Sequence, residues 1–447
     1  MSTRGLMWYK NFAHSCWSML EVFRIQTVRP DRFLTETVES MLSAIRDIAG
    51  LDLLPLQEQD GPHLGGAIEL IHACAEFVDT LTSHEWIDKA RDSCVQSLQH
   101  YVLTAIALLH AHASNDLASQ FHLRVEPRYK MRSGKSATTA PDEAWRAIMA
   151  ASSDIQLDAR ALYQLATTRN GDLTIVGALA LLAHVIAESP ESVNLGTSHS
   201  PVGALQELYP GIIAGITGRL GLTTGEDEPL FVAWWLIDGA VKRREAIDDE
   251  LIFVLVEYLG AISSHSQVSN IRFAAFRLLT YMLKELVQRE EILLMILKDL
   301  VCDCPFEPMQ VASITLVREL VLHKMDQKQN SILLSPLFRL ELATPMFDGS
   351  ATKFLTDPSL ELERFVDMYL RIVMEKLSIL YLLLARDERD LTQTKANFAS
   401  TKATFVDPLR QLMGTWLNQE GLSMSHVLDL EMLKASLDRV DSILERT

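Results

Sequence analysis

The chain has 447 residues, of which 48% are apolar, so it can bury a large hydrophobic core and is too long for one small domain. Lysine and arginine number 41 against 58 aspartates and glutamates, which gives a formal net charge of -17 at pH 7. Such an acidic chain repels phosphate backbones, so we exclude nucleic acid as the main partner. With 20 glycines and 15 prolines, it is also unlike a fibrous or largely disordered protein.

Neither a membrane span nor a secretory signal is expected. The longest apolar stretches, such as residues 173–187, are shorter than the roughly 18 to 20 residues that a membrane span requires. Residues 1–10 carry no apolar stretch followed by a small-residue cleavage site. The five cysteines follow no disulfide pattern, which is typical of a reducing compartment. We therefore predict a cytoplasmic location, with the nucleus as a further compartment.

Residues 1–122 are predicted to form an N-terminal helical section that holds four histidines close in sequence. These are His100, His110, His112 and His122. Side chains two apart on a helix point about 200° away from each other, and ten residues span nearly three turns, so these positions do not converge on one ion. We interpret them as polar residues at a helix end, with a metal site as the alternative. No metal and no other cofactor is predicted.

A basic connection follows at residues 123–141 and separates the N-terminal section from a longer C-terminal one. It carries one acidic residue, Glu126, against five basic ones: Arg124, Arg128, Lys130, Arg132 and Lys135. A solvated loop is one interpretation, and a nuclear-import address or a contact with an acidic partner is the other. The run Gly134-Lys135-Ser136 ends like a phosphate-binding loop, but Tyr129 stands where that motif requires glycine.

Residues 142–447 are predicted to form a C-terminal helical-repeat section. Apolar residues recur with helical spacing in residues 271–286 and again in residues 361–386. Prolines such as Pro210 are expected to end helices, and longer loops are expected at residues 190–201 and 326–358. Hairpin signals between alternating strands are nearly absent. The predicted fold is all-α, a HEAT- or armadillo-like α-solenoid of antiparallel helix pairs, with an irregular helical bundle as the alternative.

Three residues of this section are candidates for contact with a partner. Trp234 and Trp235 lie together in an apolar segment, where aromatic side chains either pack in a core or serve as binding hot spots. Cys304 and its neighbour Cys302 are spaced too closely for a thioredoxin-type pair, so we interpret them as packed thiols, with peroxide sensitivity as the alternative. No nucleotide-binding, hydrolase-elbow or zinc-protease motif is found, so no catalytic residue is predicted.

A resemblance to a known family rests on short motifs between about residues 250 and 400. These are the helix from Asn270 to Leu283, the step Asp303-Cys304-Pro305, the step Ser335-Pro336-Leu337-Phe338 and the leucine-rich helix that ends at Arg386-Asp387. In this order they resemble the glomulin and YAP-binding protein family. The N-terminal part carries no recognisable resemblance, and no contact residue of the family can be placed on this chain.

The resemblance implies a HEAT-type helical protein without enzymatic activity. Glomulin masks the RING subunit of cullin-RING ubiquitin ligases, and fungal relatives bind the YAP transcription factor and support its activation by peroxide. The resemblance also suggests that Cys304 is linked to the response to peroxide. An association with kinetochores occurs in the family as well. By resemblance, the protein partner is a cullin-RING ligase RING subunit or a YAP-type bZIP factor.

The function predicted from the sequence is that of a non-enzymatic adaptor or inhibitor. An acidic helical face would cover a basic patch on the partner and deny it to competitors. The alternative is a structural scaffold subunit of a larger assembly such as the kinetochore. An α-helical enzyme with an unrecognised pocket is the third hypothesis.

Overall fold

The computed structural model describes residues 30–51, 63–83, 91–125, 140–168, 173–190, 200–217, 225–327, 330–357, 359–418 and 422–444. Within these ranges the chain forms helices and turns and no β-strand, which confirms the predicted all-α class. No helix in the described ranges is long and apolar enough to cross a membrane.

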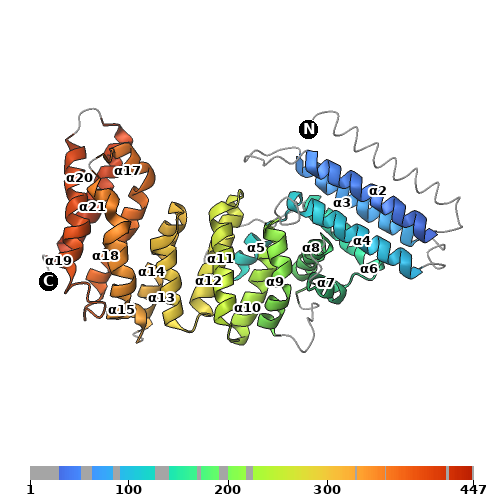
Figure 1. Ribbon diagram of the computed structural model, residues 1–447, viewed down its shortest axis with the longest axis horizontal. Helices are drawn as coiled ribbons and strands as arrows, with labels where there is room; N and C mark the ends of the chain where they lie inside the picture. Colours follow the sequence, from blue (N-terminus) through green and yellow to red (C-terminus); the bar gives the residue numbers. More distant parts are fainter. Residues whose placement is uncertain are drawn as a thin grey trace. The chain divides into compact units, whose positions relative to one another are not determined.

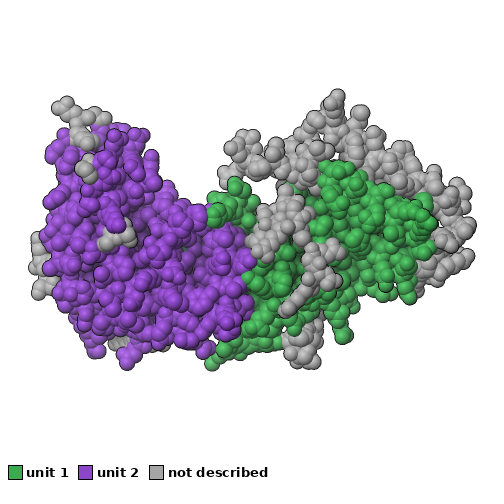
Figure 2. All heavy atoms as spheres, viewed as in Figure 1, with its two compact units in different colours: residues 1–246, 265–278 green, residues 247–264, 279–447 purple. Residues whose placement is uncertain are grey.

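The chain divides into two compact units (Figure 2). Unit 1 comprises residues 1–246 and 265–278, and unit 2 comprises residues 247–264 and 279–447. Unit 1 thus holds residues from both sides of the predicted connection at 123–141. Most of that connection, residues 126–139, lies outside the described residues, so its character as a flexible linker stays a prediction.

Unit 1 contains the described helices up to residue 246 and, in addition, the first part of α12 (Figure 1). Their bounds are α2 Pro30–Leu51, α3 His63–Thr82, α4 Arg91–Leu109, η2 His110–His112, α5 Leu117–Val125, α6 Ala140–Asp154, α7 Ala159–Ala166, α8 Leu173–Glu188, α9 Pro201–Thr217, α10 Asp227–Arg243 and α12 Ser269–Glu285.

Helix α8 lies at the centre of unit 1, because nearly every side chain from Ile175 to Ile186 is buried. It packs against α4, α7, α9 and α10. The approach to α4 is close at Gly177, where an added Cβ would lie 1.8 Å from the carbonyl oxygen of Leu103. A side chain at this position would therefore push the two helix backbones apart.

Pro210 lies inside α9 and does not end it, contrary to the expectation from sequence. A proline inside a helix leaves the carbonyl four residues earlier without its usual donor. Here both Pro210 and Gln206 are exposed, so water can reach that carbonyl. The helix continues to Thr217 for this reason.

Unit 2 contains α11, the end of α12 and all later elements (Figure 1). Their bounds are α11 Asp249–His265, α13 Glu290–Lys298, η4 Asp299–Asp303, α14 Glu307–Gln327, η5 Ile332–Leu334, α15 Pro336–Phe338, η6 Arg339–Ala343, α16 Thr344–Phe347, η7 Gly349–Thr356, α17 Leu362–Met368, α18 Leu370–Arg386, α19 Phe398–Thr401, η8 Lys402–Val406, α20 Asp407–Leu417 and α21 Met424–Leu444.

Residues 326–358 were expected to form a loop, but most of this segment consists of short helical turns. Two serine caps explain the difference. The Ser331 side chain accepts a hydrogen bond from the backbone N–H of Leu333, and the Ser335 side chain accepts one from Leu337, with Pro336 at the first helical position. Within the described residues of unit 2, three elements, η4, η6 and η8, are π-helical turns.

The helix predicted over residues 361–386 is present but interrupted at Tyr369. This residue has φ −124° and ψ −24°, and separates α17 from α18. Its ring stacks on Phe354 with centroids 4.1 Å apart and an interplanar angle of 4°. The interruption thus coincides with a tertiary contact that the helical periodicity of this segment does not reveal.

The close approach of α8 and α4 gives a first prediction. Gly177→Ala should lower the free energy of unfolding by at least about 2 kcal/mol, because backbone atoms cannot move aside as a flexible side chain can. Gly260→Ala in α11 is the matched control, since its Cβ would meet nothing within 4 Å. That variant should gain roughly 0.5 to 1 kcal/mol from helix propensity. Urea unfolding followed by circular dichroism measures both, and equal effects would contradict the packing argument.

Candidate functional site

Two adjacent carboxylates are buried in unit 1 at the start of α10. Asp227 is 3% exposed and Glu228 is fully buried. Acidic residues are favourable in the first turn of a helix, where unpaired backbone N–H groups face the helix end. Here both carboxylates also interact with residues from other elements, which is what makes their burial tolerable.

Asp227 holds the start of α5. Its Oδ1 accepts a hydrogen bond from the Ala118 N–H at 2.9 Å, and its Oδ2 accepts from the Leu117 N–H at 2.8 Å and from the Ser114 hydroxyl at 2.8 Å. Burial, followed by the charge of Glu228, raises the pKa of Asp227 to about 7 against the effect of these three bonds. Helix α5 is thereby tied to α10.

Glu228 lies between two histidines. Its Oε2 is 3.2 Å from Nδ1 of His110, within hydrogen-bond distance, and its Oε1 is 3.9 Å from Nε2 of His184. Burial disfavours the carboxylate, but the two histidines outweigh it and lower the pKa of Glu228 to about 2. Gly225 makes room for this contact, because a Cβ there would lie 2.0 Å from Cε1 of His110.

His184 connects this cluster to a cavity. Its ring stacks on Trp145 with centroids 3.7 Å apart and an interplanar angle of 15°, and the Trp145 indole N–H donates to the carbonyl of Ala113 at 2.8 Å. Burial lowers the pKa of His184, against the opposing effect of Glu228. A neutral imidazole is therefore favoured at this position.

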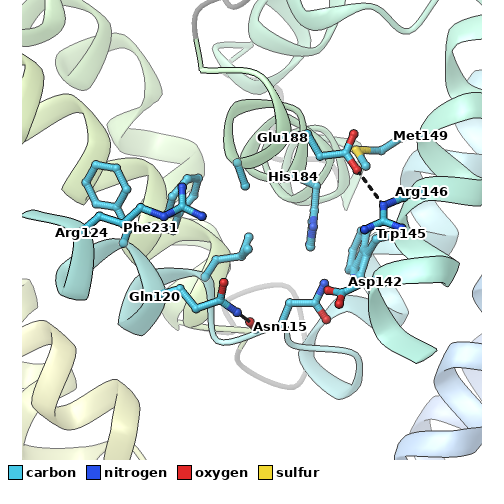
Figure 3. Close-up of a pocket in the computed structure, with 13 residues that line it drawn as sticks. Asn115, Gln120, Arg124, Asp142, Trp145, Arg146, Met149, His184, Glu188 and Phe231 are labelled. Carbon is cyan, nitrogen blue, oxygen red and sulfur yellow. Dashed lines mark hydrogen bonds and ion pairs between the residues drawn. The ribbon is translucent and has the colours of Figure 1, made fainter. Parts of the chain in front are cut away.

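The cavity itself encloses about 220 Å³ and is lined by polar and aromatic side chains (Figure 3). Arg146 pairs with Glu188 at 3.4 Å at its rim, and the Gln120 amide donates to the carbonyl of Asn115 at 2.7 Å. The lining residues include no serine, threonine or cysteine that could act as a nucleophile with His184. We interpret the cluster and its cavity as a polar core that joins α5, α8 and α10.

The four histidines singled out in the sequence do not converge. His110 contacts Glu228, whereas His100 lies 3.8 Å from Glu39. His122 packs against Trp234, and burial lowers the pKa of His112 to about 4. Among the described residues, no group of three histidines, cysteines or acidic residues could hold a metal ion.

Trp234 is completely buried, and its indole N–H lies 3.3 Å from the carbonyl oxygen of Ala274. It belongs to the core of unit 1, so this residue cannot touch a partner without unpacking that core. Trp235 is partly exposed, and contact with a partner stays a prediction for this residue.

The two cysteines in the family-like motif lie at the end of η4. Cys302 is mostly buried, and burial raises the pKa of its thiol to about 11, against the effect of nearby Lys376. A protonated thiol reacts poorly with oxidants, so Cys302 is expected to react slowly with peroxide. Cys304 is partly exposed and lies three residues before α14 begins, outside the first turn where a helix dipole acts. The four described cysteines are free thiols, and a peroxide role for Cys304 stays a prediction.

An exposed apolar row on the last helix is the clearest candidate contact surface of unit 2. Met424, Leu428 and Met432 are 79%, 61% and 49% exposed and recur every four residues. We call this row the α21 stripe. The opposite side of the helix, formed by Leu430, Leu433, Leu437 and Val440, is buried, and α21 packs on α17, α18 and α20. The stripe is therefore a second apolar face on α21. An amphipathic surface helix needs only one apolar face to pack on its own unit.

The acidic residues around the α21 stripe define its electrostatic character. On a helical projection, Glu431 follows one side of the stripe and Asp429 the other. The helix carries four carboxylates against the two cations Lys434 and Arg439, and one carboxylate, Asp441, pairs with Arg410. An apolar row with an acidic border suits a partner that presents apolar and basic side chains together.

Sequence reasoning missed the carboxylate cluster and the α21 stripe. The pair Asp227-Glu228 has the pattern of an ordinary helix start, and nothing local to it indicates contact with His110, more than a hundred residues earlier. The stripe did leave a signal, because residues 424–440 carry apolar residues on two opposite helical faces.

Comparison with known proteins gives one match. Residues 224–435 match the model of a family described as "Uncharacterised protein family, YAP/Alf4/glomulin". The match begins just before the carboxylate pair and includes the whole α21 stripe. Neither a search of curated proteins nor a search of solved structures found a match.

The buried carboxylate gives a second prediction. Glu228→Gln should lower the free energy of unfolding by roughly 1 to 3 kcal/mol at pH 7, because the hydrogen bond from His110 loses its charged acceptor. The pKa of Glu228, about 2, lies below the usual 4.5, so its stabilisation is present above pH 4.5 and lost as the pH falls toward 2. The difference between wild type and variant should shrink over that interval.

The matched control for this prediction is Glu188→Gln at the rim of the same cavity. Glu188 is half exposed in its pair with Arg146, so its loss should cost less than about 0.5 kcal/mol. Urea unfolding at several pH values measures both variants. A pH-independent difference for Glu228→Gln would contradict the assignment of a lowered pKa.

Proposed function

We propose that the protein belongs to the YAP/Alf4/glomulin family, whose model residues 224–435 match, and that it is a non-enzymatic helical-repeat adaptor or inhibitor. It acts by binding another protein and covering the surface that a competitor would use. The α21 stripe carries this proposal, because it is an apolar face that the described helices of unit 2 leave exposed.

The helical-repeat architecture is part of the proposal. In a HEAT- or armadillo-like α-solenoid of antiparallel pairs, each helix packs on its neighbour in sequence and on the next helix but one. Packing of α9 on α10 and of α7 on α8 supports the first expectation, and packing of α2 on α4 and of α8 on α10 supports the second. An irregular bundle is the alternative arrangement.

The proposed partner is the RING subunit of a cullin-RING ubiquitin ligase or a YAP-type bZIP transcription factor. The net charge of −17 favours fast, salt-sensitive association with a basic partner. The side chains of the α21 stripe would supply the buried centre of the interface, and Glu431 and Asp429 its acidic border. Such partners would place the protein in the cytoplasm and the nucleus.

A second candidate function is that of a structural scaffold subunit in an assembly such as the kinetochore. The name of the matching family refers to the kinetochore, and this supports the scaffold as the second candidate. A scaffold subunit would co-purify with its assembly in fixed stoichiometry and localise to discrete foci, whereas an adaptor would exchange between free and bound forms.

The α21 stripe gives a third prediction. Replacing Met424, Leu428 and Met432 together by serine should weaken binding of the full chain to its partner at least about tenfold, because each apolar side chain buried at an interface contributes roughly 1 to 3 kcal/mol. Unfolding should change little, since these side chains are exposed. Surface-based binding assays with purified RING subunit and bZIP factor, at low and high salt, measure the effect.

Val268→Ser is the control for this prediction, because Val268 is 51% exposed and lies outside α21. It should bind as the wild type does. Wild-type binding to neither partner at low salt, or equal affinity of the stripe variant and the wild type, would contradict the proposal.

A further inference from the structure

A second cavity, partly open to solvent, lies within unit 2 and has a volume of about 500 Å³. Small-molecule sites in proteins typically occupy roughly 300 to 1,000 Å³, so this cavity has the size of a ligand site. It is formed by side chains from the η4 turn, α14, η7, the break at Tyr369 and the first half of α18. The lining residues are Val301, Cys302, Gln310, Lys353, Phe354, Asp357, Tyr369, Ile372 and Lys376.

Lys376 is the unusual member of this lining. It is 3% exposed and lies in α18 on the same face as Ile372, Leu380 and Leu383, which are all buried. Burial lowers the pKa of its ammonium to about 8, while neighbouring Cys302 acts in the opposite direction. Lysine side chains are rarely buried to this extent.

Two aromatic side chains line the cavity. Phe354 and Tyr369 stack with centroids 4.1 Å apart and nearly parallel rings. Val301 and Ile372 add aliphatic surface, so the cavity combines an apolar wall with a buried ammonium group. This combination suits a ligand with a flat apolar body and one charged end.

The charged groups of the lining favour an anion. Lys376 and Lys353 stand against one carboxylate, Asp357, whose Oδ1 accepts hydrogen bonds from the N–H of Ser359 at 2.9 Å and from its hydroxyl at 2.6 Å. These bonds lower the pKa of Asp357 and engage the carboxylate in its own turn. The Gln310 amide is fixed by donating to the carbonyl of Cys304 at 2.6 Å. The lining is thus cationic within a strongly acidic chain.

We propose that this cavity binds a small organic anion, a carboxylate on a flat apolar or aromatic body, with Lys376 as the residue that holds its charged end. The ammonium and the carboxylate would form an ion pair in a site of low dielectric, where such pairs are stronger than on a surface. The body of the ligand would lie along Phe354, Tyr369 and Ile372.

The pH dependence of binding follows from the groups that face Lys376. These are the thiol of Cys302 on η4, the phenol of Tyr369, Lys353 on η7, and Asp357 one residue after η7. The pKa of Cys302 is raised to about 11, so this thiol stays neutral while Lys376 titrates near pH 8. A carboxylate ligand favours the charged amine, so affinity should be highest below pH 8 and fall by about tenfold between pH 7 and pH 9.

The test uses the purified full chain and three probes in NMR titrations. The probes are 2-naphthoate, the neutral 2-naphthalenemethanol with the same ring system, and acetate with the same charge but no ring. We expect 2-naphthoate to bind at least about tenfold more tightly than either of the others. Lys376→Met should weaken its binding by at least about tenfold and remove the pH dependence.

Lys376→Met shortens the unbranched side chain by one atom and removes a charge from a buried position, so the variant is expected to fold. Lys298→Met is the matched control in the same unit, since Lys298 pairs with Glu341 at 3.0 Å and does not line the cavity. It should bind 2-naphthoate as the wild type does. No binding of 2-naphthoate, equal binding of the neutral probe, or unchanged affinity in Lys376→Met would each overturn the proposal.

Discussion

Both units depend on apolar faces that helices can cover only with other helices. In the described residues there is no sheet to hold distant segments together, so each helix is fixed by how well its buried face fits its neighbours. The fit is tightest at Gly177, where α8 approaches the backbone of α4. A carboxylate that enters such a face needs hydrogen-bond donors, and for Asp227 and Glu228 these come from other elements.

The polar groups inside the two units illustrate two outcomes of this constraint. Asp227 and Glu228 accept hydrogen bonds from η2, from Ser114 and from the start of α5, so their burial joins α10 to elements about a hundred residues earlier in the chain. Lys376 is buried as deeply, yet it lines a cavity of ligand size. The hydrogen bonds within unit 1 account for the first arrangement, whereas the second has space beside the charge for another molecule.

The all-α class and several helices could be predicted from sequence, because apolar periodicity is a local property. The periodic segment at residues 271–286 corresponds to α12, and the one at residues 361–386 corresponds to α17 and α18. Lys376 could also have been found, since it occupies a central position of the apolar face of α18. The contact of Glu228 with His110 and the stacking of Tyr369 on Phe354 depend on tertiary packing, and no local pattern encodes them.

Unit 2 contains π-helical turns at residues 299–303, 339–343 and 402–406, and these turns make internal sequence repeats harder to detect. Each such turn accommodates one residue more than an α-helical turn. Where the helix continues beyond the turn, as after residues 343 and 406, the extra residue rotates the rest of the helix by about 100° about its axis. Ancestral duplications of a helix pair would lose their common phase after each insertion. Searches for internal duplication in this chain should therefore allow single-residue gaps at these three turns.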